Sequence, residues 1–316
     1  MWMRDIMAQT LIDLMESDPD IVLLDADLAS SNGTLAVHRR FPQRTFDLGI
    51  AEQNMVCLAA GLASYGFKPY ISSFTPFATR RVCDQIAISV LYAGMNVKII
   101  GTDPGITAEL NGGTHMSMED IGVLRSIPGS VIFEPADPVE LQLGLRAMHE
   151  YPGPVYMRTY RKEWSPLYDP KTYHFDLFRA DVLREGSDVT ILASGLMVRE
   201  ALEAAQRLAG EGVDAEVINV HTVKPLDTQT ILRSLRKTRC AVAAENHNVI
   251  GGLRSAVLES IADQVSVPVT AVGVADTFGE VGTLPYLKQR FHLDSEAIQE
   301  QAKRALSLKR KWGDAS

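Results

Sequence analysis

Short apolar segments alternate with longer amphipathic segments along most of this chain. The short runs predict buried strands, and in the first half they lie at residues 21–25, 69–73, 97–101, 130–133 and 154–157. Helical spacing occurs at residues 7–15, 51–65, 77–92 and 138–149, and Asp137 is a predicted cap for the last of these. Such alternation is typical of a parallel sheet covered by helices on both faces.

The alternation stops near residue 159 and resumes near residue 185. The segment between is rich in Tyr, Pro, Lys and Asp and has no sustained period. Beyond it, strands are predicted at residues 189–193, 215–220, 240–244 and 267–272, and helices at residues 198–211, 228–235, 253–262 and 295–312. We therefore predict two three-layer α/β/α domains, with residues 1–160 in the first, 161–184 in a linker and 185–316 in the second.

The composition excludes several classes of protein. Apolar residues make up 46% of the 316 residues, which is ordinary for a folded globular chain. The 31 basic and 39 acidic side chains give a net charge of −8, which argues against a nucleic-acid binder. No apolar run approaches the roughly 18 residues of a membrane span. The cysteines Cys57, Cys83 and Cys240 have no metal-ligand spacing, so we predict no metal site on this chain and a cytoplasmic location.

Polar and aromatic residues follow the predicted strands, where parallel sheets bind their ligands. Glu52 begins a helix of small residues among apolar neighbours. It is either a surface cap or a buried carboxyl group that keeps a proton at neutral pH. Phe74 and Phe77 form either a platform for a ring or part of the core. His115, next to paired glycines, is either structural or an acid–base group.

Two further segments are equally open to interpretation. Arg158 ends a predicted strand, where its guanidinium group binds an anion or forms a salt bridge to the adjoining linker. Residues 25–33, which include Asp27 and Ser31, form either a ligand loop or a helix cap with a turn. No single segment is specific for one function, but the order and spacing of all of them together are informative.

Taken together, these segments resemble the pyrimidine-binding domain of transketolases and deoxyxylulose-phosphate synthases. The likeness rests on residues 49–53 (GIAEQ), on Phe74 and Phe77, and on residues 113–115 (GTH) with Glu119 and Asp120. Residues 26–32 are similar to a transketolase element, and residues 223–227 (VKPLD) and 245–253 (ENHNVIGGL) to the transketolase C-terminal domain. The resemblance covers nearly the whole chain. It implies a thiamine-pyrimidine-binding domain followed by a transketolase C-terminal-like domain.

The resemblance also implies roles for individual residues. Glu52 matches the glutamate that binds N1′ of the aminopyrimidine, Phe77 the residue that stacks on that ring, and His115 a residue that contacts the donor. The implied catalytic residues are Glu52 and His115. The implied cofactor-binding residues are Asp27, Ile50, Glu52, Phe74 and Phe77. The implied substrate-binding residues are Arg4, Ser31, Asp103, Asn111, His115 and Arg158, of which Arg4, Ser31 and Arg158 would bind the acceptor's phosphate.

Three residues depart from the family pattern. Asn111 stands where an aspartate is usual, Asp103 where a phosphate-contacting histidine is usual, and Arg80 where the aromatic trio has a tyrosine. A carboxylate beside an anion is repulsive unless it binds a hydroxyl or ammonium group instead. We therefore expect a less common ketose, branched, deoxy or sulfonated, as the donor.

The sequence has no Gly-Asp-Gly motif, with which the family holds magnesium and the diphosphate. The resemblance therefore implies the C-terminal subunit of a split, thiamine-diphosphate-dependent transketolase, which transfers a two-carbon ketol unit from a ketose (phosphate) to an aldose (phosphate). The start at Met1, just ahead of a helix, favours a natural subunit over a fragment. A partner subunit would supply the diphosphate and Mg²⁺ site, in a heterotetramer built on a homodimer of this chain.

The sequence leaves two alternatives open. The first is the β subunit of a 2-oxoacid dehydrogenase E1 component, which shares the two-domain plan and the glutamate. The retained Arg4, Ser31 and Arg158, with the residues at 114–120, favour the transketolase. The second is a non-catalytic assembly subunit, against which the presence of Glu52, Phe77 and His115 argues.

Overall fold

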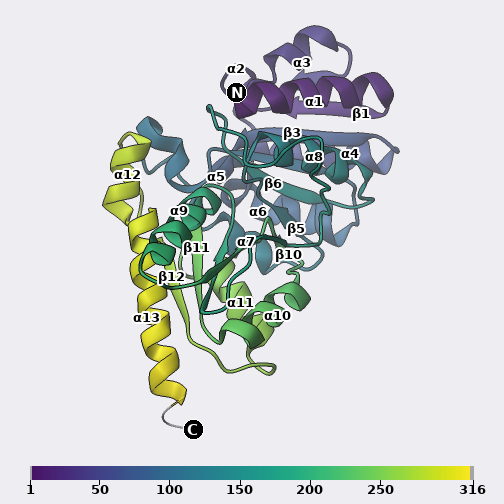
Figure 1. The fold of residues 1–316 in the computed structure, drawn as a ribbon. Coiled ribbons are helices and arrows are strands. Elements are labelled where there is room, and N and C mark those ends of the chain that lie inside the picture. The colour runs from purple at the N-terminus through teal and green to yellow at the C-terminus, as the bar shows by residue number, and fades with distance from the viewer. Residues whose placement is uncertain (1, 314–316) are drawn as a thin grey trace.

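The computed structural model describes residues 2–313 and contains two sheets, each with helices packed on both faces (Figure 1). The seven-stranded sheet has the order β10-β5-β6-β4-β3-β1-β2, and the five-stranded sheet the order β12-β11-β8-β9-β7. Neighbouring strands are parallel except β10 with β5 and β7 with β9. The predicted pair of three-layer α/β/α units is therefore confirmed. Residue 1 and residues 314–316, at the ends of the predicted domains, lie outside the described residues.

The first sheet comes mainly from the first half of the chain. Its strands are β1 (Ile21–Asp25), β2 (Thr45–Asp47), β3 (Lys68–Phe74), β4 (Lys98–Thr102), β5 (Val131–Phe133), β6 (Val155–Thr159) and β10 (Thr222–Lys224). The surrounding helical elements are α1 (Met3–Ser17), α2 (Ala29–Asn32), α3 (Leu35–Arg40), α4 (Glu52–Ser64), α5 (Thr75–Ala78), η1 (Arg80–Val82), α6 (Cys83–Gln85), η2 (Ile86–Tyr92), η3 (Gly105–Asn111), α7 (Asp120–Arg125) and α8 (Pro138–Glu150). One face packs against α1 and α8, the other against α4 and η2.

The second sheet is built in the same way. Its strands are β7 (Asp181–Arg184), β8 (Val189–Ala193), β9 (Ala215–Asn219), β11 (Ala241–Asn248) and β12 (Val269–Val274). Its helices are α9 (Met197–Gly210), α10 (Thr228–Thr238), α11 (Leu253–Ile261), α12 (Leu284–Phe291) and α13 (Ser295–Gly313). Figure 1 shows the long helix α13, in yellow, running along the side of this sheet. None of the helices within residues 2–313 is long and apolar enough to cross a membrane.

Local sequence explains several of these elements. The Asp137 side chain accepts a hydrogen bond from the Glu140 amide at 2.7 Å, and Pro138 occupies the first turn, so α8 begins at the predicted cap. The helix predicted over residues 77–92 is instead broken into α5, η1, α6 and η2. The break falls at Thr79, whose φ/ψ of −132°/−81° is not helical. Its hydroxyl donates to the Thr75 carbonyl at 2.6 Å, a local bond that competes with helix continuation.

The predicted domain limits do not coincide with the limits of the two sheets. The last residues of the predicted linker form β7, which is the edge strand of the second sheet. Within the second half, β10 pairs with β5 and so extends the first sheet. The second half of the chain is therefore joined to the first sheet by strand pairing.

Candidate functional site

The candidate site lies where β3 and β4 end and α4 begins. Glu52 is the first residue of α4, and its side chain is only 3% exposed. Its Oε1 accepts a hydrogen bond from Arg81 Nη1 at 2.7 Å. An open cavity of about 490 Å³ lies beside this pair and is lined by residues 50–54 and Arg81. Ile50 is 76% exposed here. A buried carboxylate thus faces an opening of ligand size.

Three aromatic rings lie together at the end of β3. The ring centroids of Phe74 and Phe77 are 6.2 Å apart, and His115 contacts them edge-on at 5.8 Å and 5.3 Å respectively. The guanidinium carbon of Arg81 lies 3.8 Å from the Phe77 ring centroid. The structure therefore brings Glu52, Phe74, Phe77 and His115 into one cluster, linked through Arg81.

A second polar cluster adjoins these rings and centres on Arg161, which sequence reasoning missed. The Arg161 guanidinium lies 4.9 Å from the Phe74 ring centroid, forms an ion pair with Asp103, and donates to the Ser31 carbonyl at 3.4 Å. Burial raises the pKa of the Asp103 carboxyl group to about 6, against the opposing effect of Arg161. Arg4 lies alongside, since its amide donates to the Arg161 carbonyl at 3.1 Å. Arg4, Ser31 and Asp103 therefore meet around an arginine that sequence analysis did not select.

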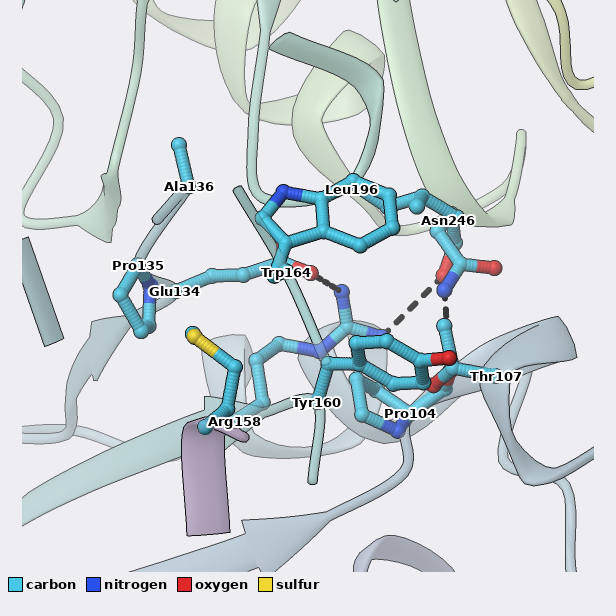
Figure 2. Close-up of a pocket in the computed structure, with 11 residues that line it drawn as sticks. Pro104, Thr107, Glu134, Pro135, Ala136, Arg158, Tyr160, Trp164, Leu196 and Asn246 are labelled. Carbon is cyan, nitrogen blue, oxygen red and sulfur yellow. Dashed lines mark hydrogen bonds and ion pairs between the residues drawn. The ribbon is translucent and has the colours of Figure 1, made fainter. Parts of the chain in front are cut away.

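Arg158 does not belong to this cluster, contrary to its prediction as a phosphate ligand. Its guanidinium is completely buried, with Nε 2.8 Å from Asp120 Oδ2 and Nη1 2.9 Å from Glu134 Oε1. Burial acts to lower the pKa of Arg158, but the Asp120 and Glu134 carboxylates raise it overall. It also donates to the Asn246 carbonyl at 3.2 Å, which ties the two sheets together (Figure 2). Arg158 therefore forms salt bridges, but its partners are Asp120 and Glu134 and not residues of the adjoining linker.

The cavity next to Arg158 is too small for a sugar. It measures about 20 Å³, which is enough for one water molecule. Figure 2 shows Tyr160 and Trp164 beside it, with Asn246 entering from the second half of the chain. A ligand phosphate would have to replace carboxylates already paired with this arginine, so Arg158 has a structural role.

Asp27, Asn111 and His115 each make a local hydrogen bond. The Asp27 backbone has φ +60° and its amide donates to Asp47 Oδ1 at 2.9 Å, which fixes the turn after β1. The exposed Asn111 side chain donates to the Ala108 carbonyl at 2.9 Å and so ends η3. His115 pairs with the Thr114 hydroxyl, with Nδ1 and Oγ1 2.9 Å apart.

One group of potential metal ligands occurs within residues 2–313. Oxygen and nitrogen atoms of Glu140, Asp181 and His221 lie within 4.8 Å of one another. The Tyr173 hydroxyl donates to Asp181 at 2.6 Å and lies 3.1 Å from Glu140, and Asn219 donates to Glu140 at 2.9 Å. Burial raises the pKa of Glu140 to about 8. These contacts describe a hydrogen-bonded network between α8 and the second sheet.

The fold and site define a two-domain α/β protein with a buried glutamate and an aromatic platform at the carboxyl edge of a parallel sheet. Comparison with known proteins specifies the family. The family model of the transketolase pyrimidine binding domain matches residues 1–165, and that of the transketolase C-terminal domain matches residues 179–298. The chain belongs to the transketolase family.

Relatives of similar length share this organisation. The chain is 50% identical over 301 residues to a 6-deoxy-6-sulfo-D-fructose transketolase subunit of Clostridium sp. (strain MSTE9), covering 95% of this chain and 93% of that one. It is 38% identical over 301 residues to a putative transketolase C-terminal section of Methanocaldococcus jannaschii, covering 95% and 94%.

A solved structure shares the fold throughout. It is that of a split gene transketolase in an inactive β4 tetramer, with a TM-score of 0.89, 38% identity and coverage of 98% of this chain and 99% of that one. These matches support a transketolase, a transferase whose family depends on thiamine diphosphate, over the 2-oxoacid dehydrogenase alternative.

Proposed function

We propose that this chain is the C-terminal subunit of a two-chain transketolase that moves a two-carbon ketol unit from a ketose to an aldose. The observation that carries the proposal is the buried Glu52 carboxylate, which faces an open cavity beside Phe77 and His115. The missing Gly-Asp-Gly motif supports a partner chain that holds the diphosphate and Mg²⁺. The similarity to a subunit of another split transketolase supports the same division.

The residues present fit the pyrimidine end of thiamine diphosphate. When bound, this cofactor supplies the carbon nucleophile that carries the two-carbon unit. Glu52 would hold a proton at the ring nitrogen of the aminopyrimidine, because its carboxyl group is buried at the cavity wall. Phe77 would support the ring face, and Phe74 and Ile50 would line the pocket. His115 would donate a hydrogen bond to the donor sugar, since it lies against both phenylalanine rings.

The substrate end of the site carries the ion pair of Arg161 with Asp103, and the Arg4 amide and the Ser31 carbonyl lie beside Arg161. The Arg161 guanidinium favours an anionic substrate, and the family resemblance assigns Arg4 and Ser31 to the same end of the site. Asp103 is already paired with Arg161, so its charge does not oppose an anion as strongly as an isolated carboxylate would. We propose a sulfonated ketose such as 6-deoxy-6-sulfo-D-fructose as the donor, because the relative named for this sugar is 50% identical. The relative named for apulose 4-phosphate is 32% identical.

Calorimetry and turnover assays test the two parts of the proposal. Thiamine diphosphate with Mg²⁺ is titrated into this chain, alone and mixed with its partner chain, and binding is expected only in the mixture. Tight binding by this chain alone contradicts the shared site. Turnover of the complex is then compared for the sulfonated ketose, apulose 4-phosphate and xylulose 5-phosphate. If xylulose 5-phosphate is much the best donor, the proposed donor is wrong.

Assembly and location follow as further parts of the proposal. We propose a heterotetramer with two copies of each chain, in which this chain forms the central dimer. The related split gene transketolase is inactive as a β4 tetramer, which is in keeping with a need for the partner. The cysteines Cys57, Cys83 and Cys240 are unpaired, in keeping with a reducing cytoplasm. A non-catalytic assembly role would require that Glu52→Gln leave the turnover of the complex unchanged.

A further inference from the structure

The Arg81 guanidinium contacts both side chains that we propose to bind the aminopyrimidine, those of Glu52 and Phe77. Its Nη1 donates to Glu52 Oε1 at 2.7 Å, and its central carbon lies 3.8 Å from the centroid of the Phe77 ring. Glu52 is almost fully buried, whereas the Arg81 side chain is 40% exposed. The arginine therefore reaches into the cavity from its open side.

The break in the helix after β3 explains why Arg81 points there. Thr79 has a non-helical backbone, so η1 begins on a new axis at Arg80. Arg80 and Arg81 then point to different partners, Arg80 to Glu119 at 2.5 Å and Arg81 to Glu52. In addition, Gln53 Nε2 donates to the Arg81 carbonyl at 3.4 Å, which links η1 to the start of α4. The contact with Glu52 is thus part of the local backbone arrangement.

A guanidinium group and an aminopyrimidine ring make the same two kinds of contact. Both are planar, both can form a hydrogen bond with the Glu52 carboxyl group at an edge, the guanidinium through an N–H group and the ring through the nitrogen that shares the glutamate's proton, and both can stack on an aromatic face. Arg81 covers Glu52 Oε1 and one face of the Phe77 ring. We take the aminopyrimidine to use this same oxygen and this same face, so that the two groups exclude each other.

We propose that Arg81 occupies the aminopyrimidine position of the cofactor-free chain and turns out to solvent when the cofactor binds. This inference rests on the proposed function, because it concerns the same pocket. In the free chain the arginine neutralises a carboxylate that burial would otherwise leave unpaired. Its long side chain, already partly exposed, can turn outward without a change in the backbone. The cofactor therefore competes with a residue of the protein for Glu52.

Cofactor affinity in the two-chain complex tests this competition. Thiamine diphosphate with Mg²⁺ is titrated into complexes that carry wild-type chain, Arg81→Ala or Arg81→Lys. Arg81→Ala should lower the Kd on the order of 10-fold, because neither the ion pair nor the stacked contact has to be broken. Arg81→Lys keeps the charge without the planar stack and should give an intermediate Kd.

Arg40→Ala is the matched control. Arg40 pairs with Glu16 at 2.9 Å and lies 5.4 Å from the Phe41 ring centroid, so it has the same kinds of contact outside the site. Its substitution should leave the Kd unchanged. A second readout is the unfolding midpoint of the cofactor-free chain, which Arg81→Ala should lower because Glu52 loses its partner.

The outcomes separate this inference from the function on which it rests. If wild-type complex binds the cofactor and Arg81→Ala binds it equally well or more weakly, the inference is wrong and the proposed function stands. If no complex binds the cofactor, the proposed function itself fails. Should Arg81→Ala not fold, Arg81→Lys is compared with wild type. A lower Kd for Arg81→Lys supports the inference, and an equal or higher Kd contradicts it.

Discussion

Two arginines at the end of β6 differ in environment although they are only three residues apart. Arg158 is inside the strand and points into the carboxylates of Asp120 and Glu134, whereas Arg161 follows the strand and reaches Asp103 and the Phe74 ring. Every residue of β6 is buried, so hydropathy does not indicate which face an arginine takes. The position of Arg161 just beyond the predicted strand could have identified it as a site residue, because ligands bind at the carboxyl ends of parallel strands.

Substitutions at these two arginines should have opposite consequences. Arg158→Met should lower the free energy of unfolding by about 3–5 kcal/mol, because it leaves Asp120 and Glu134 buried without their cation. Arg161→Gln should cost less stability, because a single buried carboxyl group, Asp103, loses its cation and its raised pKa lets it become neutral, and it should raise the KM of the complex for an anionic ketose. Urea denaturation and steady-state kinetics measure the two effects. Equal loss of stability in both variants would contradict the assignment.

Glu52 offers a direct test of the catalytic assignment. Glu52→Gln keeps the shape of the side chain but removes the group that holds a proton at the cofactor ring. We expect kcat of the reconstituted complex to fall by about 10²- to 10⁴-fold, the range for loss of an acid–base group. Circular dichroism should show an unchanged fold. The same substitution at the surface residue Glu16 serves as the control and should leave kcat as in wild type.

At the level of elements, regular strands were easier to predict than the segments that carry function. The predicted strand at residues 189–193 coincides with β8, and the capped helix begins at Pro138 as expected. The helix predicted at residues 77–92 is wrong, because a threonine hydroxyl takes over a backbone carbonyl at Thr75. That break orients Arg81 toward Glu52, so the prediction from helical periodicity was wrong in the segment that contacts the site. Periodicity reports burial, whereas the site depends on local hydrogen bonds.

The network between α8 and β9 should make stability depend on pH. Burial raises the pKa of Glu140 to about 8, from an ordinary value near 4.5 in the unfolded chain. The folded state therefore binds more protons than the unfolded state between these values, and its stability falls as pH rises. Between pH 5.5 and 8.0 we expect a loss of about 3 kcal/mol from this group. Urea denaturation of Glu140→Gln should lack this component, whereas Glu16→Gln should retain it.

At the level of the whole molecule, one face carries large apolar side chains in contact with solvent. Phe278 is 85% exposed and Val281 is 64% exposed, and their loop packs against the glycines at 112 and 113 near the exposed Leu110. A monomer rarely leaves several such residues uncovered together. These residues were ambiguous in the sequence, because an apolar residue in a loop indicates neither exposure nor a partner.

This face predicts self-association of the isolated chain. Phe278→Glu should increase the monomer fraction, since burying a charge in an apolar contact is unfavourable. Light scattering coupled to size-exclusion chromatography measures the mass of both forms. Tyr65→Glu, at another exposed ring remote in sequence, is the comparison and should leave the mass distribution unchanged. An unaltered mass for Phe278→Glu would exclude this loop from the contact.

The pairing of β10 with β5 has a consequence for how such chains can be divided. Thr222–Lys224 completes the edge of a sheet whose other strands precede residue 160. Without these residues β5 would become the exposed edge of the sheet, and an uncovered strand edge is prone to pair with other chains. An exchange of the first half alone between related genes should therefore also replace residues 222–224, because β10 must fit the strand with which it pairs.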